Sequence, residues 1–283
     1  MKIKIQAPAK INLYLEIIGK RPDGYHNLES VMQTVSLFDD ITVEDISSGI
    51  ILECDNANIP SDSSNLAYKA ALSLQKHFDI QKGVKITLKK EIPTGAGLGG
   101  GSSDAAAVIK ALVKLWGIKA SKPELESIAA GLGADVPFFL TGGTAVCKGI
   151  GEIVFPLANI RKMPIILVNP GFGVSTPSVY RNVEFPLTKP RKIRIIERLI
   201  CGGSFNKNDA SKYCFNRLEE FVFPAYPEIA KIKSIMADLG CASLMSGSGA
   251  TVFCILGSES QSETIKSKLR EYHWNTWTVY PVK

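Results

Sequence analysis

The chain has 283 residues, 45% of them hydrophobic and 21% charged, and a formal net charge of +6. This composition is typical of a globular protein with a sizeable core and excludes a disordered chain, and the apolar runs are too short to span a bilayer. The six cysteines are scattered and never form a C-x-x-C pair, which argues against a zinc or redox motif and predicts free thiols in a cytoplasmic protein.

The first third of the chain is expected to be rich in β-strands. Alternating or continuous apolar residues predict strands over residues 2–7, 11–17, 30–37 and 41–46. A helix is then expected over residues 65–78, followed by a strand over residues 83–92.

A glycine-rich loop over residues 93–104 leads from that strand into an Ala-rich helix. Apolar residues recur along this helix at 3.6-residue spacing, and Gly117 is expected to end it. A second helix begins with a capping box formed by Ser121 and Glu124 and fades at Gly131.

The second half of the chain is expected to form a separate domain, with a junction over residues 157–164. Strands are expected over residues 164–169 and 251–256 and near the C-terminus, with several helices between them. We therefore predict an α+β protein with two domains, residues 1–157 and residues 158–283.

The glycine-rich loop carries the clearest chemical signal. Its glycines, at positions 95, 97, 99, 100 and 101, let a backbone approach a ligand closely and adopt positive φ angles. Ser102, Ser103 and Asp104 then open the helix, whose free N–H groups and dipole attract phosphate. We expect valine at Gly97 or Gly100 to abolish phosphate binding, by filling the phosphate space, while leaving the fold intact.

Three other phosphate loops do not match this segment. A dinucleotide-binding fold requires a strand after the helix and an acidic residue about 20 positions on, where this chain has Gly117, Ile118 and Lys119. A Walker loop requires a Lys after its last Gly, where this chain has Ser102. A protein kinase requires H-R-D and D-F-G segments, and the sequence contains neither. A glycine turn with a purely structural role is the remaining alternative.

The segment PTGAGLGGGSSDAAA resembles the nucleotide loop of the GHMP kinase superfamily, which includes galactose, homoserine, mevalonate and phosphomevalonate kinases. The segments APAKINLYLEIIGKRPDGYHNL, GADVPFFL and MSGSGATVF stand in the order of that superfamily and extend the resemblance from residue 7 to residue 253. The Gly-Tyr-His element resembles one branch, the kinases that act on 4-diphosphocytidyl-2-C-methyl-D-erythritol in the non-mevalonate route to isoprenoid precursors.

This resemblance implies an ATP-dependent small-molecule kinase. It would phosphorylate the tertiary hydroxyl of that diphosphocytidyl alcohol and give the 2-phosphate and ADP. The implied fold has an N-terminal nucleotide-binding α+β domain and a C-terminal ferredoxin-like α+β domain. The residues implied to bind ATP are Asn65, Pro93, Gly95, Ala96, Gly97, Leu98, Gly99, Gly100, Gly101, Ser102 and Ser103.

Magnesium is expected to bridge the β- and γ-phosphates, because it prefers phosphate oxygens, water and few protein ligands. Ser102 or Ser103 is a candidate ligand, although N-capping of the helix explains both serines equally well. The sequence leaves the metal ligands open.

Two polar residues are candidates for catalysis. Asp135 lies in a Gly-Ala-Asp-Val-Pro turn that can hold a carboxylate rigidly, although an ordinary turn aspartate fits the pattern as well. Lys10 lies in a short polar break between apolar stretches, where a charge that protects a sheet edge is the alternative. The resemblance implies that Asp135 is the catalytic base and that Lys10 pairs with it and orients the accepting hydroxyl.

Tyr25 and His26 follow a Pro-Asp-Gly turn and offer an aromatic face and a polar edge, which suit a flat heterocycle. Ordinary packing at the edge of a core is the alternative for both. The resemblance assigns the pair to the cytosine of the substrate, with Tyr180 as a second stacking face. The other residues expected to bind substrate are Asn12, Lys148, Gly247 and Ser248.

Two other functions fit the sequence less well. A homoserine or mevalonate kinase is disfavoured because those substrates have no base for the Gly-Tyr-His turn to stack. A nucleic-acid-binding module has only charge in its favour, since residues 158–283 carry 17 Lys and Arg against 10 Asp and Glu. The densest cluster, Lys189 to Arg198, has helical spacing without interleaved aromatic residues, so we interpret it as a solvated helix face. We expect no nucleic-acid or membrane partner and a monomer or weak homodimer.

Overall fold

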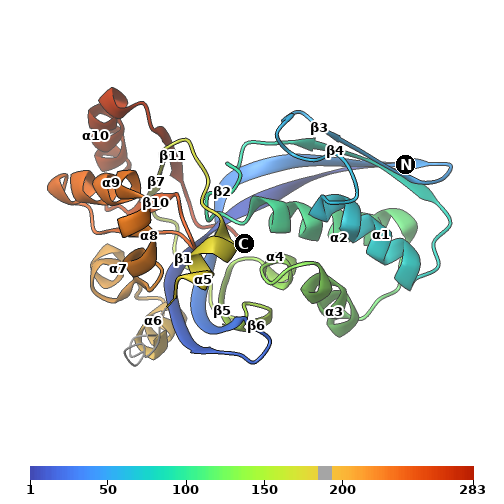
Figure 1. Ribbon diagram of the computed structural model, residues 1–283, viewed down its shortest axis with the longest axis horizontal. Coiled ribbons are helices and arrows are strands. Elements are labelled where there is room, and N and C mark those ends of the chain that lie inside the picture. Colours follow the sequence, from blue (N-terminus) through green and yellow to red (C-terminus); the bar gives the residue numbers. More distant parts are fainter. Residues whose placement is uncertain (184–192) are drawn as a thin grey trace. The chain divides into compact units, whose positions relative to one another are not determined.

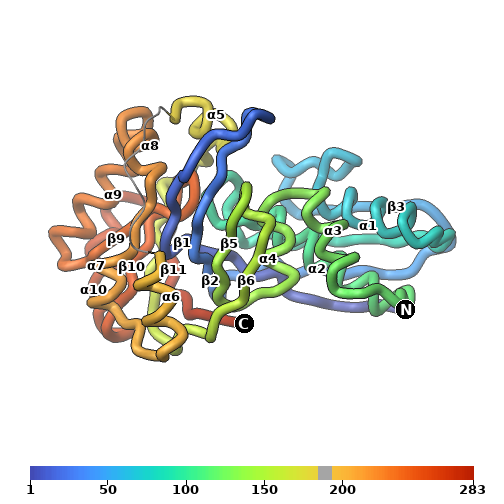
Figure 2. The backbone as a smooth tube through the Cα atoms, turned by 90° about the horizontal axis from the view of Figure 1, so that it is seen from below, coloured from blue at the N-terminus to red at the C-terminus, as the bar shows by residue number. Residues whose placement is uncertain are grey.

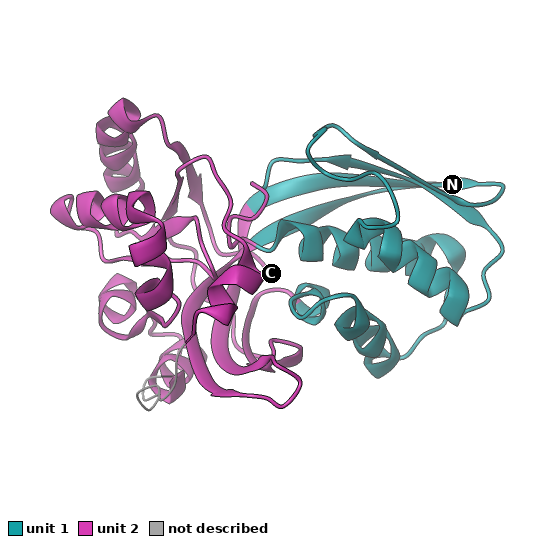
Figure 3. Cartoon of the chain, viewed as in Figure 1, with its two compact units in different colours: residues 1–9, 37–92, 99–141 teal, residues 10–36, 93–98, 142–283 magenta. Residues whose placement is uncertain are grey.

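The computed structural model describes residues 1–183 and 193–283, which pack into two compact units (Figure 3). Unit 1 comprises residues 1–9, 37–92 and 99–141, and unit 2 comprises residues 10–36, 93–98 and 142–283. Two long neighbouring strands, β1 (Lys2–Lys20) and β2 (His26–Ile46), contribute to both units. The domain boundary expected after residue 157 stays a prediction.

Unit 1 has helices on one face of a small sheet (Figure 1). β3 (Ile50–Cys54) pairs in parallel with β4 (Gly83–Lys89), which pairs antiparallel with the last part of β2. A parallel pair needs a crossover, and α1 (Leu66–His77) supplies it. The other helices of the unit are α2 (Gly100–Trp116), α3 (Lys122–Leu132) and α4 (Val136–Thr141).

The helix boundaries of unit 1 follow local chemistry. The side chain of Asn65 accepts the N–H of Ala67 and begins α1, and the capping box of Ser121 and Glu124 begins α3 as predicted. Gly117, with a φ of 66°, ends α2. Buried alanines on α1 and α2 let these helices pack closely: Ala67, Ala70, Ala71, Ala105, Ala106 and Ala107.

Unit 2 contains a four-stranded antiparallel sheet in the order β11-β7-β10-β9. Its strands are β7 (Ile165–Asn169), β9 (Ser243–Met245), β10 (Val252–Ile255) and β11 (Asn275–Val279). The helices α9 (Pro227–Asp238) and α10 (Glu259–Leu269) lie on the same side of it (Figures 1 and 2). The chain therefore runs strand, helices, two strands, helix, strand, which is the ferredoxin-like order and confirms that prediction.

The remaining elements of unit 2 complete the fold around β1 and β2. β5 pairs with both β2 and β6, and β8 pairs in parallel with β1. These elements are β5 (Thr144–Gly149), β6 (Ile153–Pro156), α5 (Thr176–Arg181), α6 (Ile193–Cys201), α7 (Lys207–Tyr213), β8 (Phe215–Asn216), α8 (Glu219–Ala225) and the 3-10 helix Arg270–Tyr272.

The structure joins elements that the sequence suggests are separate. Residues 2–7 and 11–17 form one strand. Lys10, in the polar break between them, is buried and hydrogen-bonded to Asn12. The strands expected at 30–37 and 41–46 are likewise parts of β2. Elements as short as α4, β8 and β9 carry too few residues for a periodic pattern and were not predicted.

Several other expectations concern the whole chain. All six cysteines are free thiols. Within residues 1–183 and 193–283, no helix is both long and apolar enough to cross a bilayer. Of the basic cluster, Arg194 and Arg198 lie on α6, whereas Lys189, Arg191 and Lys192 lie outside the described residues. The cytoplasmic location stays a prediction.

Candidate active site

The first part of the glycine-rich loop, residues 93–98, is hydrogen-bonded to the rest of unit 2. Four consecutive carbonyls accept hydrogen bonds: Gly95 from the N–H of Val174 (2.8 Å), Ala96 from the N–H of Thr251 (3.1 Å), Gly97 from Oγ of Ser246 (2.9 Å) and Leu98 from the N–H of Lys10 (2.9 Å). Because C=O and N–H point in opposite directions across a trans peptide, each following N–H points away from the protein group that binds its carbonyl.

The backbone conformation of this loop alternates between left-handed glycines and other residues, a pattern that favours the binding of anions. Gly95, Gly97 and Gly99 have φ angles of 64°, 75° and 72°. Alternation of left-handed residues with others turns successive N–H groups into a concave nest for an anion. Gly99 begins α2 without a side-chain cap, so the first N–H groups of the helix are left for a ligand or water. The loop therefore has the geometry that phosphate binding requires.

Gly97 has no space for a side chain. A Cβ on Gly97 would lie 1.9 Å from the carbonyl oxygen of Ser246, in the second glycine turn (residues 246–249). At Gly100 a Cβ would lie 3.1 Å from the Ile92 side chain. The expectation that valine at Gly97 leaves the fold intact is therefore wrong, because the obstacle is backbone of the protein itself.

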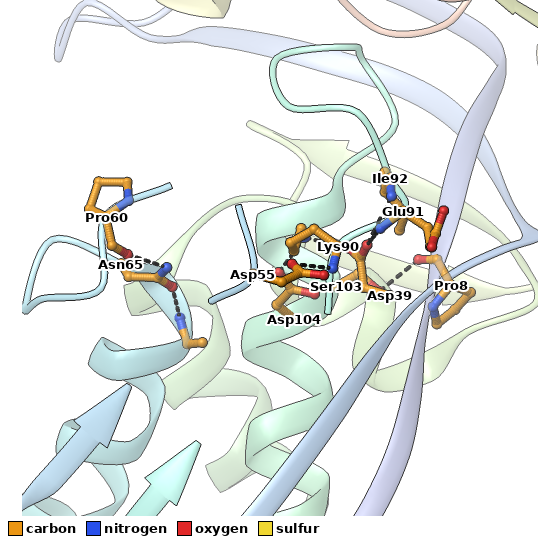
Figure 4. A network of polar contacts seen from close by, with 11 residues as sticks. Pro8, Asp39, Asp55, Pro60, Asn65, Lys90, Glu91, Ile92, Ser103 and Asp104 are labelled. Carbon is orange, nitrogen blue, oxygen red and sulfur yellow. Dashed lines mark hydrogen bonds and ion pairs between the residues drawn. The ribbon is translucent and has the colours of Figure 1, made fainter. Parts of the chain in front are cut away.

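A buried charge network lies beside the start of α2 in unit 1 (Figure 4). Lys90, just ahead of the loop, forms ion pairs with Asp39 and, at 2.5 Å, with Asp104 on α2. Oδ1 of Asp39 also accepts the N–H groups of Glu91 at 2.7 Å and Ile92 at 2.9 Å. The network thus joins the strand end that enters the loop to the helix that leaves it.

Burial sets the charges of this network. Burial raises the pKa of Asp104 to about 7, against the opposing charge of Lys90. Burial also disfavours the ammonium of Lys90, but the carboxylates of Asp104 and Asp39 outweigh it and raise the pKa of that lysine. Sequence reasoning missed this network, although Asp39 lies in phase with the buried residues Leu37 and Ile41 on an alternating strand, which marks it as an inward-facing carboxylate.

We expect Lys90→Met to lower the free energy of unfolding by about 3–5 kcal/mol, because it leaves two buried carboxylates without their cation. Lys89→Met is the matched control, since Lys89 is the exposed last residue of β4, directly before Lys90, and it should change stability by less than about 0.5 kcal/mol. Urea unfolding of both variants measures the difference. Equal losses in the two variants would contradict the role assigned to the network.

Lys10 lies beside the second glycine turn in unit 2. Its side chain is buried, and Nζ donates to Oδ1 of Asn12 at 2.5 Å. Asn12 Nδ2 donates in turn to Ser30 Oγ at 2.9 Å. A Cβ on Gly247 would lie 3.2 Å from Lys10 Nζ and 3.4 Å from Asn12 Oδ1. The structure therefore places Gly247 beside Lys10 and Asn12, which lie more than 230 positions away in the sequence.

Asp135 and the two serines belong to unit 1. Asp135 is half-buried directly before α4, and its carbonyl accepts the N–H of Phe139 at 3.3 Å. Ser103 is buried and its Oγ donates to the carbonyl of Pro8 at 2.6 Å (Figure 4). Ser102 is half-buried, and its Oγ would lie 3.9 Å from a Cβ on Gly133. The pairing of Asp135 with Lys10 stays a prediction.

The predicted base-binding residues lie in unit 2. The rings of His26 and Tyr180 stack with centroids 5.5 Å apart and planes 28° apart, whereas Tyr25 is 60% exposed. In this arrangement the ring of Tyr180 packs against His26, and its role as a second stacking face for the base stays a prediction. Burial, with a smaller effect of Lys20, lowers the pKa of His26, so its ring is neutral at pH 7 and offers both a donor and an acceptor.

Three other predicted residues have partners within their own units. Lys148 on β5 forms an ion pair with Glu29 at 3.3 Å, directly across from it on β2. Ser248 Oγ is 2.7 Å from Oγ1 of Thr176 on α5. Asn65 uses its amide to cap α1 and to bind the Pro60 carbonyl at 2.8 Å (Figure 4). Their ligand-binding roles stay predictions.

The comparisons with known proteins agree with this geometry. The model of the GHMP kinases N terminal domain matches residues 65–143, and that of the GHMP kinases C terminal domain matches residues 199–273. A Clostridium botulinum (strain Loch Maree / Type A3) protein named 4-diphosphocytidyl-2-C-methyl-D-erythritol kinase is 41% identical over 94% of this chain and 95% of its own. A Clostridium beijerinckii protein of the same name is 42% identical over 95% of this chain and 96% of its own.

Solved structures give the same result. A crystal structure of 4-(cytidine 5'-diphospho)-2C-methyl-D-erythritol kinase is 36% identical, with a TM-score of 0.82 over 99% of this chain and 100% of the other. Homoserine kinase from Cytophaga hutchinsonii shares the fold, with a TM-score of 0.78 at 18% identity over 99% of this chain and 94% of the other. The chain therefore belongs to the GHMP kinase superfamily and, within it, to the 4-diphosphocytidyl-2-C-methyl-D-erythritol kinase family.

Proposed function

We propose that this ATP-dependent kinase phosphorylates the tertiary hydroxyl of 4-diphosphocytidyl-2-C-methyl-D-erythritol and gives the 2-phosphate and ADP. The position of Lys10 carries the proposal, because its N–H binds the glycine loop at Leu98 while its ammonium lies against Gly247 in the second glycine turn. The choice of alcohol rests on the relatives named for that substrate, which are 41–42% identical over nearly the whole chain.

Each residue has a distinct part in the proposed reaction. The N–H groups of residues 96–99 bind phosphate oxygens, and their fixed orientation removes the cost of ordering them during transfer. Asp135 accepts the proton of the attacking hydroxyl. Lys10 orients that hydroxyl and stabilises the negative charge that develops on it. Asn12 holds the ammonium of Lys10 in place through the 2.5 Å hydrogen bond.

Magnesium fits the donors that unit 1 offers. Ser102 Oγ is an oxygen donor close to Gly133, two residues from the Asp135 carboxylate, whereas Ser103 already donates its proton to the Pro8 carbonyl. Oxygen donors are those that Mg²⁺ prefers, so Ser102 is the better protein ligand of the two serines. The ion would supply charge neutralisation between the β- and γ-phosphates.

The other parts of the substrate are assigned to unit 2. Tyr25 has an exposed ring on which a pyrimidine can stack, and the neutral ring of His26 can hydrogen-bond its edge. Gly247, Ser248 and Lys148 are proposed to hold the diphosphate and erythritol, with the charge of Lys148 shared with Glu29.

A panel of alcohols tests the proposed function. ADP release is measured with ATP, Mg²⁺ and, in turn, 4-diphosphocytidyl-2-C-methyl-D-erythritol, methylerythritol phosphate, homoserine and mevalonate. We expect turnover with the first and very little with methylerythritol phosphate, which lacks the cytidine. If homoserine or mevalonate is turned over efficiently and the diphosphocytidyl alcohol is not, the assignment of kinase activity stands and the proposed substrate is wrong.

Tyr25→Ala should raise the KM for the diphosphocytidyl alcohol by about 10-fold or more, because stacking of a base contributes about 1–3 kcal/mol. This energy acts equally in the ground and transition states, so kcat and the KM for ATP should change little. Tyr213→Ala, at a partly buried tyrosine on α7, is the control and should leave all three constants unchanged. A Tyr25 variant with an unaltered KM would exclude this ring from the base site.

A further inference from the structure

The second glycine turn is held by one buried side chain that the proposed mechanism does not use. Asn216, at the end of β8, is 2% exposed, and its Nδ2 donates to the carbonyls of Met245 and Gly247, both at 2.7 Å. Its Oδ1 accepts the N–H of Leu218 at 2.9 Å. An amide nitrogen has two N–H donors, so both are used and only one orientation of the side chain satisfies all three contacts.

Asn216 is itself held firmly. Its strand pairs with β1, where the N–H of Arg217 donates to the carbonyl of Leu15 at 2.9 Å. The guanidinium of Arg217 also donates to both carboxylate oxygens of Glu16, at 2.7 and 2.9 Å, and both side chains are buried. Two parallel hydrogen bonds of this kind fix the orientation of the guanidinium relative to the carboxylate as well as the distance between them. The amide of Asn216 is therefore presented to the turn from a rigid support.

The second glycine turn lies against Lys10, which is proposed to act on the alcohol, and against the glycine-rich loop, which is proposed to bind phosphate. Gly247 faces Lys10 and Asn12, and Ser246 binds the carbonyl of Gly97 in the loop. With the Gly247 carbonyl directed at Asn216, planarity of the peptide directs the N–H of Ser248 the opposite way. Loss of the Asn216 donors would free this peptide to rotate beside Lys10.

We infer that Asn216 is a positioning residue of the kinase reaction, which acts by fixing the orientation of the second glycine turn beside Lys10. This inference rests on the proposed function, because it acts through the roles given there to Lys10 and Gly247. The inferred role belongs to a buried amide on β8 whose hydrogen bonds go to Met245, Gly247 and Leu218, so it acts through the turn.

Asn216→Asp tests the inference, because it keeps the shape but turns an oxygen toward two carbonyl oxygens. We expect kcat to fall about 10- to 100-fold, as for a misplaced reacting group. The KM for ATP should stay within about twofold, because the loop keeps its hydrogen bonds at Gly95, Ala96 and Leu98. This split between kcat and KM is not expected from a loss of stability alone.

Ser262→Ala is the control for stability, since it removes a 2.6 Å hydrogen bond between the buried Ser262 and Thr278 elsewhere in unit 2. It should lower the melting temperature and leave kcat unchanged. If Asn216→Asp lowers the melting temperature similarly but retains kcat, the inference is overturned. Should Asn216→Asp fail to fold, Asn216→Ser, which is neutral and smaller, must show the same fall in kcat.

Assaying the unmutated chain with the panel of alcohols tests the proposed substrate independently of the role of Asn216. If it turns over a different alcohol from the panel, the substrate assignment fails, and the variants are then compared on the accepted alcohol. The ratio of kcat between Asn216→Asp and the unmutated chain still decides the role of Asn216.

Discussion

Asp135→Asn is expected to lower kcat by about 10²–10⁴ and to leave the KM for ATP little changed. Asparagine keeps the shape of the half-buried side chain before α4 but cannot take the proton from the attacking hydroxyl. Steady-state ADP release with the diphosphocytidyl alcohol measures the effect, and thermal unfolding checks that the variant is folded.

Asp62→Asn is the matched control for this substitution, because Asp62 is an exposed aspartate ahead of α1 in the same unit. It should leave kcat unchanged. A loss of less than tenfold in Asp135→Asn would mean that transfer proceeds without a protein base, with the proton leaving through the phosphoryl group or water. The role of Lys10 in charge stabilisation would then carry more of the catalysis.

Gly97→Ala is expected to destabilise unit 2 by more than about 4 kcal/mol and to abolish turnover. The new Cβ would lie 1.9 Å from the Ser246 carbonyl oxygen, and the φ of 75° adds strain for any residue other than glycine. Even the smallest side chain therefore separates the loop from the second glycine turn. Calorimetry and ADP release together measure the two effects.

Gly101→Ala is the control within the same segment. Gly101 lies in the first turn of α2, is exposed, and a Cβ there would meet only the Leu66 side chain, at 3.9 Å. Alanine is favoured over glycine in a helix by about 1 kcal/mol, so this variant should be at least as stable as the unmutated chain. A Gly97 variant with the same melting temperature as the Gly101 variant would contradict the packing described here.

The predictions that succeeded depend on residues close together in the chain. The capping box of Ser121 and Glu124 spans three positions, and Gly117 ends α2 through its own φ angle. The glycine-rich loop was found for the same reason, since its conformation is a property of consecutive glycines. Lys10 was singled out as an unusual polar residue among apolar ones, but its burial and its contact with Asn12 required the structure.

The residues that were missed act through distant partners. Asp39 and Asp40 are identical in type and adjacent, and only the phase of β2 makes the first buried and the second exposed. Asn216 shows no pattern at all in the sequence, because its partners at residues 245 and 247 lie 29 and 31 positions away. No local periodicity reports such a contact, since periodic patterns reflect neighbours within a turn or a strand.

The sequence by itself determined the superfamily, through its motifs, and the α+β class, through local conformational preferences. The ferredoxin-like second half followed only from the resemblance to that superfamily, and phosphate binding at residues 93–104 stays a prediction. Only the tertiary structure decided what each loop carbonyl binds, why Gly97 cannot carry a side chain, and how Glu16 and Arg217, 201 positions apart, support the turn beside Lys10. The physical reason is range: backbone propensity acts over a few residues, whereas burial and hydrogen bonding select partners from anywhere in the folded chain.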